Sequence, residues 1–274
     1  MKLSFTTLGC PAWDLDTICK RGRSYGFDGV DFRGLLDTLD VTLLPEFGPG
    51  LAQTRKKFKD AALEVSGFGS SITLCDASRK ASNLEEARHT ITAAKGLDCY
   101  NVRVFGGGDL EHNSRSELLN VAADTMQSIL DLDGARDLHW LFETHDNWIH
   151  SADSIPLLER INNPAFGVLW DMGHTPRVGK ETPDQTYAAL GKRIGYTHIK
   201  DAVFEPEHPK AMNDGWRYVI PGTGQLPLAQ AIELLKHNGY DGWIVFEHEK
   251  RWIANLPEPE EIFPKFVRWA RPLI

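Results

Sequence analysis

Eight short apolar runs recur along this chain, and a segment with helical periodicity follows each of them. The runs are dense in Val, Ile, Phe and Tyr, as strands are, and they lie at 2–8, 29–34, 64–70, 99–106, 139–145, 166–173, 195–201 and 242–249. Most are nearly continuous rather than alternating, which is typical of parallel strands covered on both faces. Alternating strands and helices predict a parallel sheet, and eight such units in 274 residues favour a closed (β/α)8 barrel, usually about 250 residues long.

The chain is predicted to form one domain over residues 1–274, because no linker, low-complexity block or change of composition divides it. The expected helices include Leu84–Leu97, with Asn83 as its N-cap, and Pro227–Asn238, which stops before a glycine. The longest loop-like segment, 203–223, follows the seventh run. Because long loops in compact domains are often active-site lids, we expect this one at the rim where barrel enzymes do their chemistry.

The composition argues against several classes of protein, including nucleic-acid-binding and membrane proteins. Hydrophobic residues make up 42% and charged residues 25%, an ordinary globular balance, and the formal net charge of -8 argues against binding to nucleic acid. No run approaches the ~20 apolar residues of a membrane span, and the N-terminus lacks the apolar core of a signal peptide. The four cysteines have no CxxC spacing, so we expect buried thiols in a reducing compartment. A soluble, cytoplasmic protein without membrane contact is expected.

Four consecutive strand-like runs in the second half each carry a metal-type ligand near the C-terminal end. The four candidates are Glu143 in LFETH, Asp171 in GVLWDMGH, His198 in YTHIKD and Glu247 in WIVFEH. If these strands are parallel in one barrel, their polar ends meet at one rim. Two glutamates, one aspartate and one histidine would form an oxygen-rich site that suits Mn²⁺ or Mg²⁺ best, with Co²⁺ or Zn²⁺ as substitutes.

The ligand set predicts a class of chemistry. A divalent cation chelated by two adjacent oxygens of a hydroxy-ketone lowers the pKa of the hydrogen on the carbon between them and stabilises the resulting enediolate. Glu143 and Glu247, on opposite sides of the metal, could remove and return that proton as base and acid. Transfer on two faces of one carbon gives an epimerase, and transfer between neighbouring carbons gives an isomerase.

The motifs GFDGVDFRG, FETHDN, GVLWDMGH, THIKD, PGTGQLPL and WIVFEHE resemble the xylose isomerase-like TIM-barrel superfamily of sugar and sugar-phosphate isomerases and epimerases. Similar members include the D-tagatose 3-epimerase, hydroxypyruvate isomerase and inosose dehydratase groups, and the resemblance covers essentially the whole chain. It implies the same four metal ligands, with the two glutamates as acid and base. It also implies substrate contacts from His174 and Arg217, a small carbohydrate substrate, and a homo-oligomer.

Other residues leave the reaction type open. His145, two residues past Glu143, resembles the E-x-H of the 3-dehydroshikimate dehydratase branch, where this histidine is a base, so a metal-dependent dehydratase of that or the inosose type is the alternative. Strand alternation puts His145 on the Glu143 face. Arg103 is either half of a structural ion pair or a cationic anchor for a substrate carboxylate or phosphate. Arg33 is a further polar candidate at the rim.

Three further expectations complete the set. Lys200 and Asp201, beside His198, are expected to order the ligand shell rather than to react. The abasic-site endonucleases of the same barrel class, which this chain resembles less, have a three-zinc cluster with many more histidine ligands. The negative net charge of the chain also argues against a DNA-cutting function. A non-catalytic sugar-binding barrel would lose nothing beyond binding when Glu143 or Glu247 is changed to Gln.

Overall fold

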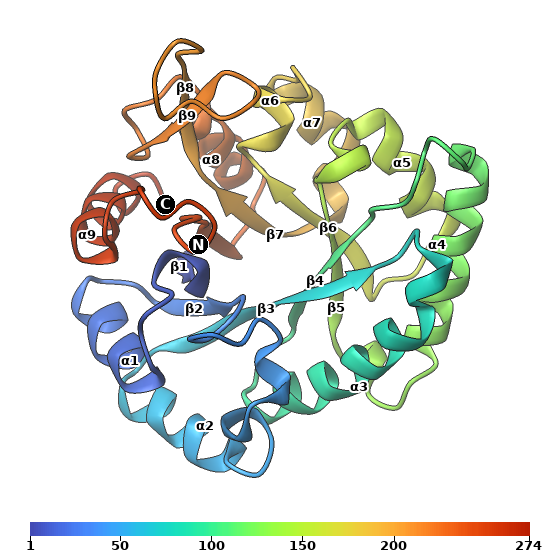
Figure 1. Ribbon diagram of the computed structural model, residues 1–274, viewed down its shortest axis with the longest axis horizontal. Coiled ribbons are helices and arrows are strands. Elements are labelled where there is room, and N and C mark those ends of the chain that lie inside the picture. The colour runs from blue at the N-terminus through green and yellow to red at the C-terminus, as the bar shows by residue number, and fades with distance from the viewer.

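The computed structural model describes residues 1–274 and forms a closed barrel of eight parallel strands (Figure 1). The strand order around the barrel is β1-β10-β7-β6-β5-β4-β3-β2. The strands are β1 (Lys2–Thr6), β2 (Gly29–Phe32), β3 (Glu64–Thr73), β4 (Asn101–Phe105), β5 (His139–Glu143), β6 (Phe166–Asp171), β7 (Ile194–Ile199) and β10 (Trp243–Phe246). Because β1 pairs with both β2 and β10, the sheet has no free edge. The predicted (β/α)8 barrel is confirmed, and each strand falls within or close to its expected run.

Helices surround this barrel and cover its outer face (Figure 1). They are α1 (Leu15–Ser24), α2 (Leu51–Asp60), α3 (Lys80–Gly96), α4 (Arg115–Leu130), α5 (Ser151–Arg160), α6 (His174–Arg177), α7 (Pro183–Leu190), α8 (Leu228–His237) and α9 (Pro259–Ala270). The main apolar core lies between the strands and these helices, and a smaller cluster of Leu141, Leu169, Tyr196 and Val245 is separate from it. All four cysteines are free and buried. None of the helices is long and apolar enough to cross a membrane.

The third helix begins earlier than the sequence pattern indicates. It starts at Lys80, so Asn83 is not its N-cap but lies inside the first turns. The Asn83 side chain instead bonds to the backbone of Thr73, accepting from its N–H at 3.2 Å and donating to its carbonyl at 2.8 Å. An asparagine that bonds to the backbone at the end of a strand looks the same in sequence as an asparagine that caps a helix. The predicted N-cap was wrong for this reason.

The segment 203–223 is partly a hairpin rather than an open loop. Strand β8 (Asp201–Phe204) pairs antiparallel with β9 (Trp216–Val219) above the end of β7. The buried Asp201 carboxylate accepts hydrogen bonds from the backbone N–H of Gly222 at 2.8 Å and of Gly224 at 2.9 Å. Asp201 therefore anchors the return of the hairpin, which corrects the expectation that it orders the ligand shell.

A polar network crosses the barrel interior below the strand ends. The Tyr196 hydroxyl donates to Asp31 Oδ2 at 2.9 Å and lies 2.8 Å from Ser66 Oγ, which in turn lies 2.6 Å from Ser4 Oγ. A β-carbon at Gly67 would lie 2.6 Å from the Tyr196 hydroxyl oxygen, closer than real contacts allow, so the glycine makes room for the network. Burial raises the pKa of Asp31, although the nearby His198 opposes this.

Tyr196→Phe is expected to lower the free energy of unfolding by about 1–3 kcal/mol, because it leaves the buried Asp31 carboxylate without its hydroxyl donor. Urea unfolding of the purified protein measures this loss. Tyr100→Phe is the matched control, since Tyr100 is exposed and removal of its hydroxyl is expected to have little effect. Equal stabilities for the two variants would contradict a structural role for the network.

Candidate metal centre and active site

The barrel brings the four predicted ligands together at the C-terminal end of its strands. Glu143 ends β5, Asp171 ends β6, His198 lies in β7, and Glu247 follows β10. Asp171 and His198 are register partners across β6 and β7. Each of the four offers one ligand atom, all within 4.8 Å of one another, and none of the four side chains is more than 7% exposed. Convergence of neighbouring parallel strands brings together Glu143 and Glu247, which are more than 100 positions apart in sequence, with the two ligands between them.

Unsatisfied atoms show that the cluster fits a cation. Glu143 Oε1 and both His198 ring nitrogens are buried without a well-formed hydrogen bond, whereas Asp171 Oδ2 and Glu247 Oε2 have the Lys200 ammonium as an ion-pair partner. Buried polar groups are normally satisfied, so several such atoms facing one point indicate a ligand that completes them. Three carboxylates also concentrate negative charge here. Although burial opposes protonation of His198, Glu247 and Glu143 raise its pKa to about 10.

Arg103 neutralises one of the two glutamates. Its Nη1 donates to Glu143 Oε2 at 2.9 Å, both side chains are buried, and the guanidinium lies 3.8 Å from the centre of the Phe105 ring. Burial alone would raise the pKa of Glu143, but Arg103 holds it well below the usual range. The ion pair expected for Arg103 is thus present, and its partner is one of the candidate ligands.

Lys200 neutralises the other side of the cluster. Its Nζ lies 3.0 Å from Asp171 Oδ2 and 2.7 Å from Glu249 Oε1, and it also contacts Glu247. Burial opposes the charge on Lys200, but these carboxylates raise its pKa well above the ordinary value. Together with Arg103 it keeps both glutamates ionised at neutral pH. This geometry is consistent with the prediction that Lys200 orders the ligand shell.

Two histidines line the same mouth. His174 begins α6 and is buried, with Nδ1 3.2 Å from the Thr144 carbonyl and Nε2 3.3 Å from Lys200 Nζ. Burial lowers the pKa of His174 to about 4, despite Asp171 beside it, so its ring is neutral at pH 7. The His145 ring lies 4.8 Å from the His174 ring between centroids, and its Nδ1 lies 2.6 Å from Asp146 Oδ1. The structure therefore places both predicted histidines at the cluster.

Arg217 lies apart from these groups. It sits in β9 and bonds to Glu205, with its Nη2 2.7 Å from Oε2. Successive residues of a strand point to opposite faces, and it is the neighbouring Tyr218 that turns toward the cluster, donating to Glu249 Oε1 at 3.0 Å. Sequence analysis missed Tyr218 and Glu249. Glu249 had a usable signal, because it lies two residues past Glu247, whereas Tyr218 required the hairpin to be recognised.

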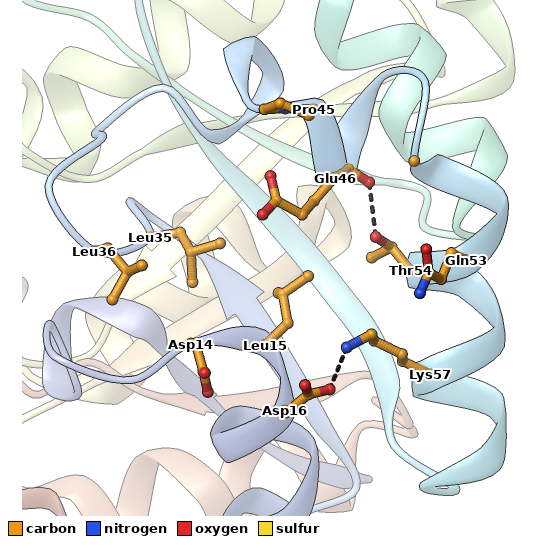
Figure 2. Close-up of a pocket in the computed structure, with 11 residues that line it drawn as sticks. Asp14, Leu15, Asp16, Leu35, Leu36, Pro45, Glu46, Gln53, Thr54 and Lys57 are labelled. Carbon is orange, nitrogen blue, oxygen red and sulfur yellow. Dashed lines mark hydrogen bonds and ion pairs between the residues drawn. The ribbon is translucent and has the colours of Figure 1, made fainter.

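A separate cavity of about 400 Å³ lies between the start of α1, the loop after β2 and α2 (Figure 2). Three of its charged side chains are already engaged, since Asp14 accepts from the Thr17 N–H at 2.8 Å and Asp16 pairs with Lys57, while Glu46 is exposed at its edge. None of the four candidate ligands lines it. The cavity is therefore distinct from the metal centre, and the groups in it serve the helix start and its neighbour.

The sequence model of a family described as "Xylose isomerase-like TIM barrel" matches residues 19–273. The chain belongs to this family. An inosose dehydratase from Clostridium botulinum (strain Eklund 17B / Type B) is 24% identical over 154 residues, which are 52% of this chain and 51% of that protein. The chain thus aligns with about half the length of this relative.

Solved structures share the complete barrel at low identity. The probable 3-DHS dehydratase AsbF from Bacillus anthracis has a TM-score of 0.79 at 17% identity over 99% of both chains. The 3-keto-D-glucoside 4-epimerase YcjR from E. coli has a TM-score of 0.77 at 14% identity over 99% of both. The IOLI protein with a bound zinc atom has a TM-score of 0.79 at 18% identity, covering 100% of this chain and 98% of that one. At such identities the likeness shows the fold alone. Enzymes of more than one reaction class share it, and one solved relative contains a metal.

Proposed function

We propose that this protein is a divalent-metal-dependent isomerase or epimerase of a small carbohydrate, either a free sugar or a sugar phosphate. The observation that carries the proposal is the position of the two glutamates. Glu143 Oε1 lies 3.4 Å and Glu247 Oε1 lies 3.2 Å from the same nitrogen of His198, so the carboxylates come from different strands to one centre. A substrate held there meets a carboxylate from each of two sides.

The chain's own residues supply the proton transfers. When bound, a divalent cation would hold two adjacent oxygens of a hydroxy-ketone and acidify the carbon-bound hydrogen between them. Mn²⁺ or Mg²⁺ suits the mostly oxygen donors, Glu143, Asp171 and Glu247 with His198. Glu247, ionised beside Lys200, accepts the proton, and Glu143, beside Arg103, donates one after taking it up from solvent as a carboxylic acid; Glu247 then releases its proton to solvent. The neutral His174 ring orients a substrate hydroxyl.

A dehydratase is the second candidate, and the position of His145 favours it. In that reaction a base removes the proton beside a carbonyl and the β-hydroxyl leaves as water, forming a conjugated double bond. His145 is near enough to His174 to reach a bound substrate, and Asp146 orients its ring. The inosose dehydratase relative is consistent with the same chemistry.

Product analysis separates the two reactions. The Mn²⁺-loaded protein is incubated in D₂O with a panel of ketoses, their 6-phosphates and keto-inositols. We expect deuterium on the carbon next to the carbonyl and a new epimer or aldose by NMR, without a gain in ultraviolet absorbance. An absorbing unsaturated product would instead establish the dehydratase. A panel that gives neither deuterium exchange nor a new product contradicts the proposed enzyme.

His145→Asn gives a second, independent comparison. If Glu143 and Glu247 carry the proton, the variant is expected to keep kcat within about tenfold of the wild type, whereas loss of a general base costs about 10²–10⁴-fold. Steady-state kinetics on the substrate found in the panel measures the difference. His150→Asn is the control, since His150 is exposed and lies in the same loop region. A loss of a hundredfold or more in His145→Asn alone would move the assignment to the dehydratase.

A further inference from the structure

Arg33, just past the end of β2, is a half-buried cation that forms no ion pair with a carboxylate. Its guanidinium has one hydrogen bond, from Nη1 to Ser71 Oγ at 3.0 Å, and it forms no ion pair within 4.0 Å. Its backbone is fixed as well, because its N–H donates to Thr7 Oγ1 at 2.9 Å. Buried charges are normally paired, so an ordered arginine with free donors indicates a missing anion.

The side chain of Arg33 points toward the mouth of the barrel, beside Arg103. A β-carbon placed on Gly69 of β3 would lie 3.0 Å from Arg33 Cδ and 3.0 Å from Arg103 Nη2, so both side chains cross over this glycine. Beyond this glycine, the Arg103 guanidinium donates a hydrogen bond to Glu143 of the metal cluster. The two arginines thus come from the β2–β4 side of the barrel, across the mouth from the β7 and β10 ligands.

The surrounding groups hold Arg33 in place without neutralising it. Glu86 of α3 attracts Arg33 electrostatically but forms no ion pair with it, and its Oε1 accepts the Ser71 backbone N–H at 2.6 Å. Ser71 is thereby fixed as the acceptor for Arg33. Burial, and repulsion by Arg103, lower the pKa of Arg33 to about 10, which still leaves it charged at pH 7. Two neighbouring guanidinium groups therefore lie on this side of the mouth, and only that of Arg103 forms an ion pair.

We propose that Arg33, assisted by Arg103, binds an anionic group of the substrate, a carboxylate or a phosphate, while the sugar oxygens lie at the metal cluster. This inference rests on the proposed function and adds the substrate class. A guanidinium fork suits either anion, since both accept two parallel hydrogen bonds. A neutral sugar would leave the buried charge of Arg33 unbalanced, so the site discriminates in favour of acids or phosphate esters.

Equilibrium binding of unreactive polyols tests this without turnover. Sorbitol, gluconate and sorbitol 6-phosphate share a six-carbon chain and differ in charge, and isothermal titration calorimetry of the Mn²⁺-loaded protein gives each affinity. We expect at least one anion to bind about tenfold to a hundredfold more tightly than sorbitol, the range of a hydrogen bond to a charged group. Preference for gluconate assigns a carboxylate and preference for sorbitol 6-phosphate assigns a phosphate, and either supports the proposal.

Variants of Arg33 decide whether this residue carries the preference. Arg33→Gln is expected to abolish it while sorbitol and Mn²⁺ affinities stay unchanged, and Arg33→Lys is expected to retain part of it. Arg88→Gln, at an exposed position of α3, removes the same charge as a control. Equal binding of all three polyols by the wild type, or a preference that survives in Arg33→Gln, overturns the inference. Failure of the ketose panel with the anion preference intact refutes only the proposed reaction.

Discussion

Glu247→Gln is expected to lower kcat by about 10²–10⁴-fold, the contribution typical of a general acid or base. The carboxamide has the same shape and still offers one oxygen toward the cluster, but it cannot accept a proton. Glu143, Asp171 and His198 remain, so Mn²⁺ binding is expected to weaken without disappearing. The measurement combines kcat on the identified substrate with the Mn²⁺ affinity from calorimetry.

A second glutamine variant tests whether the loss of one negative charge anywhere in the protein changes kcat or Mn²⁺ affinity. Glu258→Gln changes an exposed residue that pairs with Lys250 outside the cluster, and it is expected to leave kcat and Mn²⁺ affinity unchanged. Thermal unfolding of both variants shows whether either has lost its fold. A wild-type kcat in Glu247→Gln would show that this residue has no part in the mechanism. If the protein is instead a non-catalytic sugar-binding barrel, the variant would show only weaker sugar binding.

The barrel itself could be predicted from the sequence because its signal is repeated. Each of the eight strands is a short apolar run, and a chain whose strands are covered by helices needs such runs at regular spacing. The small hairpin β8–β9 was missed because both strands have only four residues and β9 is half-buried along its whole length, which leaves no apolar run to recognise. Its register depends on the tertiary bonds of Asp201 to the glycine loop, which no local pattern encodes.

The metal cluster could be predicted for a different reason. Parallel strands in one barrel direct their C-terminal ends to one rim, so four ligands need only occupy equivalent positions on their own strands. The arginine and lysine side chains that surround these ligands are harder to predict. Lys200 is two residues past His198 in sequence, yet Arg103 reaches Glu143 from another strand and Arg33 reaches the mouth from just past a third. Which charged partner meets which ligand depends on side-chain direction within the closed barrel, and sequence spacing does not determine it.

Removal of the metal is expected to abolish activity, by about 10³-fold or more, because a bound cation supplies several kcal/mol of charge stabilisation to such a reaction. Exhaustive dialysis against EDTA, followed by addition of Mn²⁺, should remove and then restore turnover. The melting temperature should follow the same cycle. A ligand that binds only the folded state stabilises it by mass action, so Mn²⁺ is expected to raise the melting temperature.

The chain contains a matched control for this experiment. Asp109, Glu111 and His112 also bring ligand atoms within 4.8 Å of one another, but this group is exposed. His112→Ala is expected to keep the full Mn²⁺-dependent rise in melting temperature and activity, whereas His198→Ala is expected to lose both, because burial distinguishes the two sites. Turnover that is indifferent to chelation would defeat the metal-dependent mechanism. A melting response lost in His112→Ala and retained in His198→Ala would place the cation at the exposed group instead.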